Sequence, residues 1–193
     1  MRTGLLFVCR ANECRSAVAR LRMTHVLACT GAQRSIDVTS AGLSARPGLP
    51  ILPVCAELLA DAGPSVAEFR TRPLEVDLLR TADVVVAMTR AELNEVLRRS
   101  PASLPVAVTL GELAQTCRFM PRAAPAGPGV RLRGLVRWTV RHRGSNGTAD
   151  TDIPDPAGQP LETVRAAAAT VIRHVDTVAV HLTRTAVPAG RPS

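Results

Sequence analysis

Leu5-Leu6-Phe7-Val8-Cys9-Arg10-Ala11-Asn12-Glu13-Cys14-Arg15-Ser16 (LLFVCRANECRS) joins an apolar run to a polar loop near the N-terminus. Residues 4–8 form a short, continuous apolar segment, as expected of a central strand in a parallel sheet. Ser16 can cap a helix, and apolar residues recur near helical spacing from Val18 onward to Cys29. The sequence therefore predicts a strand, a tight loop and a helix, in that order.

The rest of the chain continues this alternation. Further strands are expected at 36–41, 82–88 and 105–109, and helices at 51–62, after Pro73, from a Thr89 cap to about Ser100, at 110–116 and at 161–183. Strands buried on both faces and separated by helices predict an α/β fold. We expect a three-layer sandwich with a central, mostly four-stranded parallel sheet and helices on both faces.

The closing helix carries one apolar stripe, formed by Val164, Ala168, Val171, Val175, Val178 and Leu182. His174 and His181 stand seven residues apart on the same helix without metal-ligand companions nearby. We expect both histidines at the surface or at its boundary.

A length of 193 residues suits a single domain, which we place at 1–186 with a disordered tail at 187–193. An insertion at about 118–150 is rich in proline, glycine and arginine. It is interpreted either as a flexible segment with one short helix near 130–140 or as a docking surface for anions.

Composition excludes several classes of protein. With 46% hydrophobic and 21% charged residues the chain is globular, and no apolar run approaches the roughly 20 residues of a membrane span. The net charge is +8, and all 24 basic residues are arginine. This bias fits a coding preference as well as a binding surface, so the charge alone does not predict nucleic-acid binding. Five cysteines, an odd number, and no secretory signal predict a cytoplasmic protein with free thiols. The oligomeric state stays open.

The loop between the first strand and helix has the features of an anion site. Its residues are Arg10, Ala11, Asn12, Glu13, Cys14 and Arg15, whose backbone N–H groups can converge at the helix N-terminus and bind a tetrahedral oxyanion. Arg15 can hold two oxygens with its planar guanidinium. The same field is expected to lower the pKa of Cys9. The loop therefore predicts a phosphate cradle with a cysteine nucleophile at its base.

Phosphoryl transfer also requires a proton donor for the leaving oxygen. Asp155 lies in an acidic segment, residues 150–158, between Pro154 and Pro156, which restrict its backbone. Its carboxyl is either this general acid or part of an ordinary acidic loop before the last helix.

Together the two segments resemble the low-molecular-weight protein tyrosine phosphatase family. Its loop Cys-x-Gly-Asn-x-Cys-Arg-Ser is similar to residues 9–16, its Asp-Pro pair to Asp155-Pro156, and the resemblance covers all but the insertion and the tail. It implies that Cys9 attacks phosphorus, that Arg15 and the loop amides hold the oxygens, and that Asp155 acts as acid and then as base. A phosphocysteine would form. We expect no cofactor and no metal, because Cys9 and Cys14 are spaced too far apart for a zinc motif and no histidine accompanies them.

The resemblance also implies supporting roles. Ser16 would donate a hydrogen bond to the thiolate, and Asn12 would brace the loop by contacting Ser40. Cys14 would be the partner with which Cys9 forms a protective, reversible disulfide.

The loop departs from the family pattern at two positions. Ala11 replaces a glycine, where a Cβ is expected to strain the turn, and Glu13 stands where an apolar residue or threonine is usual at the pocket rim. The usual aromatic walls are replaced by Ala157, Gly158 and Arg46, so stacking on phosphotyrosine is not expected.

The main functional prediction is a phosphatase acting on phosphotyrosine-type proteins or small phosphate esters. One alternative is a phosphoarginine phosphatase, in which Glu13 accepts hydrogen bonds from the cationic leaving group. Another is a catalytically weak, anion-binding regulatory protein. An arsenate reductase is less favoured, because residues 86–97 hold no cysteine for the required thiol cascade.

Overall fold

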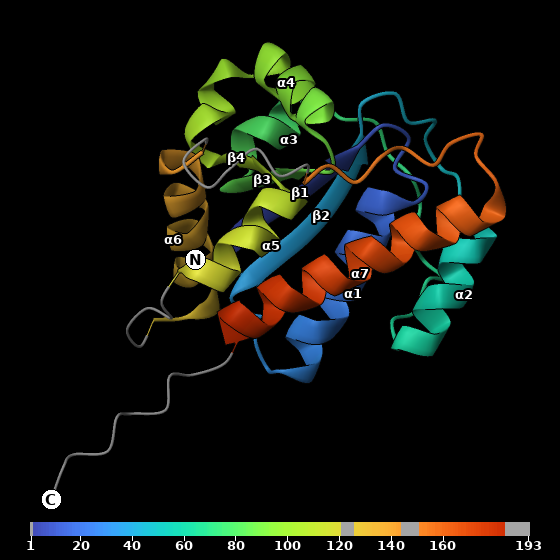
Figure 1. Cartoon of the computed structure of the whole chain (residues 1–193), viewed down its shortest axis with the longest axis horizontal. Helices are drawn as coiled ribbons and strands as arrows, with labels where there is room; N and C mark the ends of the chain where they lie inside the picture. The colour runs from blue at the N-terminus through green and yellow to red at the C-terminus, as the bar shows by residue number, and fades with distance from the viewer. Residues whose placement is uncertain (1, 121–125, 144–150, 184–193) are drawn as a thin grey trace, which may run out of the picture.

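A computed structural model describes residues 2–120, 126–143 and 151–183 of the chain (Figure 1). Its sheet consists of β1 (Thr3–Cys9), β2 (Ile36–Gly42), β3 (Val84–Ala87) and β4 (Ala107–Thr109). Its helices are α1 (Arg15–Cys29), α2 (Pro53–Ala62), α3 (Val76–Thr81), α4 (Arg90–Arg99), α5 (Leu110–Phe119), α6 (Pro128–Arg141) and α7 (Leu161–Thr183), with the 3-10 helix η1 (Pro101–Val106). All strand pairs are parallel, in the order β2-β1-β3-β4, so the predicted sheet is confirmed.

Helices cover both faces of this sheet (Figure 1). Side chains alternate along a strand, so Leu5 and Phe7 of β1 lie on one face while Leu6 and Val8 lie on the other. The first face packs against α1, α2, α5, α6 and α7, and the second against α3 and α4. The three-layer sandwich expected from the sequence is therefore confirmed.

The strand order sets the position of a ligand site. The chain passes from β1 to β2 on one side and then returns to β3 on the other side of β1. In open parallel sheets, ligands bind beyond the carboxyl ends of the strands where the order reverses. Cys9 is the last residue of β1, at this end of the sheet.

Two local expectations were wrong. Ser16 does not cap α1, which begins at Arg15 without a side-chain cap, because the Ser16 hydroxyl is directed to the neighbouring loop instead. The fourth strand does not begin at residue 105, since Pro105 lies inside η1. By contrast, Thr89 caps α4 as expected.

The helix predicted near 130–140 is present as α6, but it is not part of a flexible insertion. Its side chains Leu132, Leu135 and Val136 are buried in the main core. Two of its arginines are used inside the molecule: Arg133 donates to the Thr3 hydroxyl, and Arg131 donates to the Leu182 carbonyl at 2.9 Å. Residues 121–125 and 144–150 of the expected insertion, and the expected tail at 187–193, lie outside the described residues.

Helix α7 has the bounds predicted for it, and its apolar stripe is buried. His174 lies at the boundary as expected, whereas His181 is buried because Val178 and Leu182 place that side of the helix against the core. Among the described helices, none is both long enough and apolar enough to cross a membrane.

Candidate active site

The loop between β1 and α1 is held by backbone hydrogen bonds from the segment that follows β2. Leu43 N–H donates to the Cys9 carbonyl at 2.9 Å, and Ser44 N–H donates to the Arg10 carbonyl at 2.8 Å. Gly42 permits this approach, since a Cβ at that position would lie 2.8 Å from the Arg10 carbonyl oxygen. These bonds fix the loop from outside through its carbonyl groups and use none of its N–H groups.

Asn12 braces the loop from within. Its Nδ2 donates to Ser16 Oγ at 2.8 Å and to Ser40 Oγ at 3.0 Å, while its Oδ1 accepts from Arg72 N–H at 3.1 Å. The expected contact between Asn12 and Ser40 is thus confirmed. Among the described residues, Asn12 is the one non-glycine with a positive φ, at 59°. The strain expected at Ala11 is absent, because the left-handed position of the turn falls on Asn12, a residue that tolerates it.

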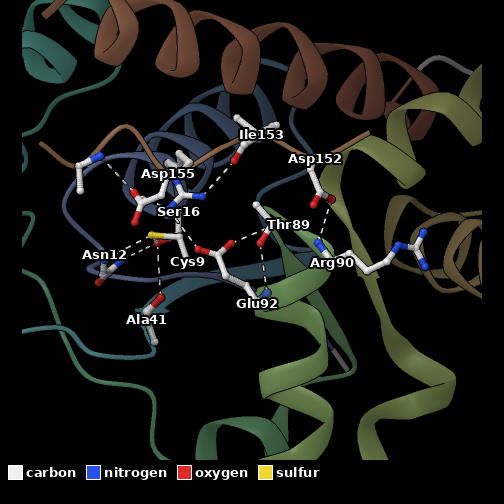
Figure 2. Close-up of polar contacts among 12 residues, drawn as sticks. Cys9, Asn12, Ser16, Ala41, Thr89, Arg90, Glu92, Asp152, Ile153 and Asp155 are labelled. Carbon is white, nitrogen blue, oxygen red and sulfur yellow. Dashed lines mark hydrogen bonds and ion pairs between the residues drawn. The ribbon is translucent and has the colours of Figure 1, made fainter. Parts of the chain in front are cut away.

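The Cys9 sulfur lies at the base of the loop, 3.0 Å from Ser16 Oγ and 3.3 Å from the Asn12 N–H (Figure 2). Because Ser16 Oγ accepts from Asn12, its one hydroxyl proton can be donated either to the Cys9 sulfur or to the Ala41 carbonyl, whose oxygen lies 3.4 Å away. Burial raises the pKa of the Cys9 thiol, although Arg15 and Ser16 act in the opposite direction. The expected lowering of this pKa is therefore wrong for the arrangement seen here.

Arg15 offsets the effect of burial on the pKa of Cys9 only in part. Its side chain is 1% exposed and is held between two carboxylates: Nη2 lies 2.7 Å from Asp155 Oδ1 and 3.1 Å from Glu92 Oε1. Nη1 donates to the Ile153 carbonyl at 3.0 Å. The guanidinium charge is thus shared with two anions, which weakens its effect on the Cys9 sulfur.

Glu92 is a site residue that the sequence analysis missed. Its Oε2 accepts from Thr89 N–H at 3.1 Å and its own N–H donates to Thr89 Oγ1 at 3.1 Å, which makes a capping box at the start of α4. Burial raises the pKa of the Glu92 carboxyl, and Arg15 opposes that shift. The spacing of Thr89 and Glu92 predicts a capping box. It does not reveal that the second carboxylate oxygen reaches Arg15.

Asp155 approaches the loop from the segment before α7. Asp152 Oδ1 accepts from Arg90 N–H at 2.8 Å (Figure 2). Ile153 N–H also donates to the Met88 carbonyl at 2.9 Å, so the segment is anchored where β3 meets α4. The Asp155 side chain remains 33% exposed, which leaves it accessible to a substrate. Asp150, expected in the same acidic segment, lies outside the described residues.

A pocket of about 380 Å³ opens beside Arg15 and Asp155. Its other lining residues are Arg10, Leu43, Ser44, Thr89, Ala91, Glu92, Glu95 and Arg99. This lining contains no aromatic side chain, as expected, but it also omits Glu13, which had been predicted at the rim. A larger pocket of about 470 Å³ between α3, η1 and α6 is lined by no residue of the Cys9 loop. Cys9 itself does not line the smaller pocket, but Arg10 and Arg15 of its loop do, together with Asp155, so the smaller pocket is the candidate substrate site.

Cys14 is buried beside the loop, but its sulfur contacts a thiol that the sequence analysis did not single out. Cys55 Sγ of α2 lies 3.0 Å from Cys14 Sγ. The hydrogen bond shared with Cys55 and burial both raise the pKa of Cys14. All five cysteines of the chain are free thiols in this structure.

Comparisons with solved structures agree with this architecture. The chain is 24% identical to the YwlE arginine phosphatase of Geobacillus stearothermophilus, with a TM-score of 0.66 over 92% of this chain and 90% of that one. It is 17% identical to the tyrosine phosphatase Wzb of Escherichia coli K30 in complex with sulphate, with a TM-score of 0.65 over 93% and 97%. At these identities the likeness shows a shared fold.

Sequence comparisons identify the family. A probable low molecular weight protein-tyrosine-phosphatase, EpsP of Ralstonia solanacearum, is 32% identical over 82 residues, which are 42% of this chain and 52% of EpsP. The chain thus spans about half the length of that curated relative. A family model described as low molecular weight phosphotyrosine protein phosphatase matches residues 4–116, more than half of the chain and including the whole Cys9 loop. The chain therefore belongs to the low molecular weight phosphotyrosine protein phosphatase family.

Proposed function

We propose that this chain is a cysteine-dependent phosphatase that hydrolyses phosphomonoesters, of the phosphotyrosine type in proteins, through a phosphocysteine intermediate. One observation carries the proposal: the Cys9 thiol, the Arg15 guanidinium and the Asp155 carboxyl converge at the carboxyl end of β1 although they come from three separate elements. A nucleophile, an oxyanion-binding cation and a proton donor are the groups that phosphoryl transfer through cysteine requires.

In the first step, the loop amides and Arg15 bind the phosphoryl oxygens, and the Cys9 thiolate attacks phosphorus. The bond from phosphorus to the leaving oxygen breaks as Asp155 transfers a proton to that oxygen. In the second step, Asp155 removes a proton from water, the water oxygen attacks phosphorus, and the bond from phosphorus to sulfur breaks. The Ser16 hydroxyl, 3.0 Å from the sulfur, stabilises the departing thiolate.

The contact between Arg15 and Asp155 supports this order of events. In the structure, Arg15 Nη2 lies 2.7 Å from Asp155 Oδ1. A phosphate dianion in the loop competes with the Asp155 carboxylate for this guanidinium. Substrate binding therefore releases Asp155 from Arg15 and frees it to face the leaving group. Glu92, held by its capping box, continues to orient Arg15.

The experiment compares hydrolysis of p-nitrophenyl phosphate by the wild type and by Cys9→Ser. We expect kcat/KM to fall by about 10⁴-fold or more, because the alcohol cannot replace the thiolate as nucleophile. Cys29→Ser is the matched control, since Cys29 is exposed on α1 and distant from the loop in sequence. Turnover retained by Cys9→Ser would overturn the proposal.

Phosphoarginine is the second candidate substrate. The pocket lining supports it, because Glu92, Glu95 and Asp155 can accept hydrogen bonds from a guanidinium leaving group and no aromatic ring is present to stack on phosphotyrosine. Rates on phosphotyrosine and phosphoarginine peptides of one sequence test this candidate. The ratio of the two rates is then measured for two variants. Glu13→Ile tests whether Glu13 sets this ratio, and Glu95→Gln tests the same for a carboxylate that lines the pocket.

The remaining alternatives give different outcomes in the same assays. A regulatory protein would bind phosphate without hydrolysing any ester. An arsenate reductase would consume thiols in the presence of arsenate, although residues 86–97 hold no cysteine for its thiol cascade. A phosphorylated protein or small phosphate ester as partner and a cytoplasmic location, which suits five free thiols, remain predictions.

A further inference from the structure

Cys14 and Cys55 form a buried pair of thiols that the proposed reaction does not use. Their sulfurs lie 3.0 Å apart, and Cys55 has no exposed surface. Cys14 is the residue immediately before α1, and Cys55 lies in the first turn of α2. The contact therefore joins the loop of residues 10–15 between β1 and α1, called the phosphate loop below, to α2.

Backbone hydrogen bonds hold these two thiols in register. Leu52 N–H donates to the Glu13 carbonyl at 2.9 Å, one residue before Cys14. The Leu52 carbonyl accepts from Cys55 N–H at 2.9 Å, so the same residue that binds the loop also starts the turn that carries Cys55. Both cysteines are thus positioned from a common point, Leu52, and their proximity does not depend on a flexible segment.

We propose that Cys14 and Cys55 are an oxidation site, at which a peroxide forms a disulfide that ties the phosphate loop to α2. The alternative implied by family resemblance is a disulfide between Cys9 and Cys14. In the structure, the Cys9 sulfur contacts Ser16 and Asn12, whereas the Cys14 sulfur contacts Cys55. Cys55, whose sulfur already contacts the Cys14 sulfur, is therefore the thiol that reacts with Cys14.

The chemistry needs hydrogen peroxide as oxidant and no other co-reactant. Peroxide transfers one oxygen to the Cys14 sulfur, which becomes a sulfenic acid while water is released. Cys55 sulfur then attacks the Cys14 sulfur, the sulfur–sulfur bond forms, and the sulfur–oxygen bond breaks. The departing hydroxide takes the Cys55 proton and leaves as a second water. Two thiols and one peroxide thus give one disulfide and two waters.

This disulfide has a different consequence from one that includes Cys9. It leaves the Cys9 thiol reduced, so that oxidation does not remove the nucleophile from the chain. It also takes Cys14 out of reach of Cys9, which prevents the pairing that would block the sulfur. The cross-link fixes the loop against α2 and is expected to stabilise the fold, because it constrains the unfolded chain.

Peptide mapping distinguishes the two disulfides directly. Trypsin cleaves after arginine and places each cysteine on its own peptide: Cys9 on 3–10, Cys14 on 11–15, Cys29 on 23–34, Cys55 on 35–70 and Cys117 on 100–118. The full chain is treated with hydrogen peroxide, alkylated with iodoacetamide under denaturing conditions, digested without reductant and analysed by mass spectrometry. We expect peptides 11–15 and 35–70 to be linked and the Cys9 peptide to be alkylated.

Two variants separate this site from the proposed phosphatase function. Cys9→Ser cannot turn over substrate but is expected to form the same link, and Cys55→Ser is expected to lose it. The melting temperature should rise by about 5 °C or more on oxidation of the wild type and return with dithiothreitol. A link between peptides 3–10 and 11–15, or alkylation of both Cys14 and Cys55 after Cys9 is oxidised, would overturn the proposal.

Discussion

The side chain of Arg15 connects most of the groups at the site. It is buried between Glu92 and Asp155 and also donates to the Ile153 carbonyl, so its position is determined by three separate contacts. Burial of this cation is compensated by the two carboxylates. The same carboxylates reduce its effect on the Cys9 sulfur, whose pKa is raised mainly by burial and partly by the negative charge of Glu92.

Neutralising Glu92 is expected to change the ionisation of Cys9. Because Glu92 disfavours the thiolate, Glu92→Gln should lower the pKa of Cys9 and move the midpoint of its reaction with iodoacetamide to lower pH. The rate is followed on the peptide that carries Cys9. Glu95→Gln is the control, because Glu95 also lines the pocket but pairs with Arg98 and Arg99. An upward shift in Glu92→Gln would contradict this reasoning.

Asp155 is expected to matter only for leaving groups that need a proton. Asp155→Asn should lower kcat/KM on phenyl phosphate by about 10²-fold or more, and should change kcat/KM little on p-nitrophenyl phosphate, whose phenolate departs unaided. The measurement is the ratio of kcat/KM values for the two esters, because kcat/KM reports the step in which the leaving group departs and not the later hydrolysis of the phosphocysteine. Equal losses on both substrates would assign Asp155 to the orientation of Arg15 and not to proton transfer.

At the scale of elements, the start of α4 organises the site. The capping box of Thr89 and Glu92 places a carboxylate against Arg15, and the neighbouring Met88 carbonyl and Arg90 N–H anchor the segment that carries Asp155. The junction of β3 and α4 therefore positions both acidic groups that contact Arg15. A helix cap, usually a matter of stability alone, here also bears on the site.

The capping boxes at the starts of α4 and α5 provide a matched test. Thr89→Ala at α4 and Thr109→Ala at α5 should each lower the free energy of unfolding by about 1 kcal/mol, since both threonines accept a hydrogen bond from a helix N–H. Thr89→Ala alone should also lower kcat/KM, because it loosens Glu92. Urea denaturation and steady-state kinetics measure the two effects. Equal kinetic losses in both variants would show that the α4 cap has no special role.

At the scale of the whole molecule, α6 completes the layer formed by α1, α2, α5 and α7. The composition of residues 118–150 obscured this role, because proline, glycine and arginine are common in flexible segments. The arginines of this segment suggested a docking surface for anions, but two of them bind inside the molecule: Arg133 contacts Thr3, and Arg143 contacts Glu112. The helix is therefore part of the core on which the sheet and the site depend.

A substitution in α6 tests this role. Leu135→Ala should lower the free energy of unfolding by about 3 kcal/mol, because it leaves a cavity in the core, whereas Val130→Ala on the same helix should change it by less than about 0.5 kcal/mol. Leu135 is fully buried, and Val130 is 55% exposed. The measurement is urea denaturation monitored by circular dichroism. Similar small effects at both positions would show that α6 contributes little to the core.

The fold was predictable from sequence because its strands are continuous apolar segments separated by turn residues and by periodic helical segments, one of them with a clear cap at Thr89. The sequence also predicted the loop residues Cys9, Asn12 and Arg15, because they belong to one contiguous motif. It predicted the distant Asp155 because that residue lies between two prolines in an acidic segment. Glu92 and Cys55 were missed because their contacts depend on how α4 and α2 approach the loop. The raised pKa of Cys9 was missed because it depends on burial, which the loop sequence does not specify.

The central claim is that Cys9 carries a covalent phosphoryl group during turnover. Stopped-flow mixing with excess p-nitrophenyl phosphate tests it most directly, because the good leaving group makes formation of the intermediate faster than its hydrolysis. The account predicts a burst of p-nitrophenolate with an amplitude near one per active site, and no burst for Cys9→Ser. A linear time course in the wild type, together with undiminished turnover by Cys9→Ser, would contradict it.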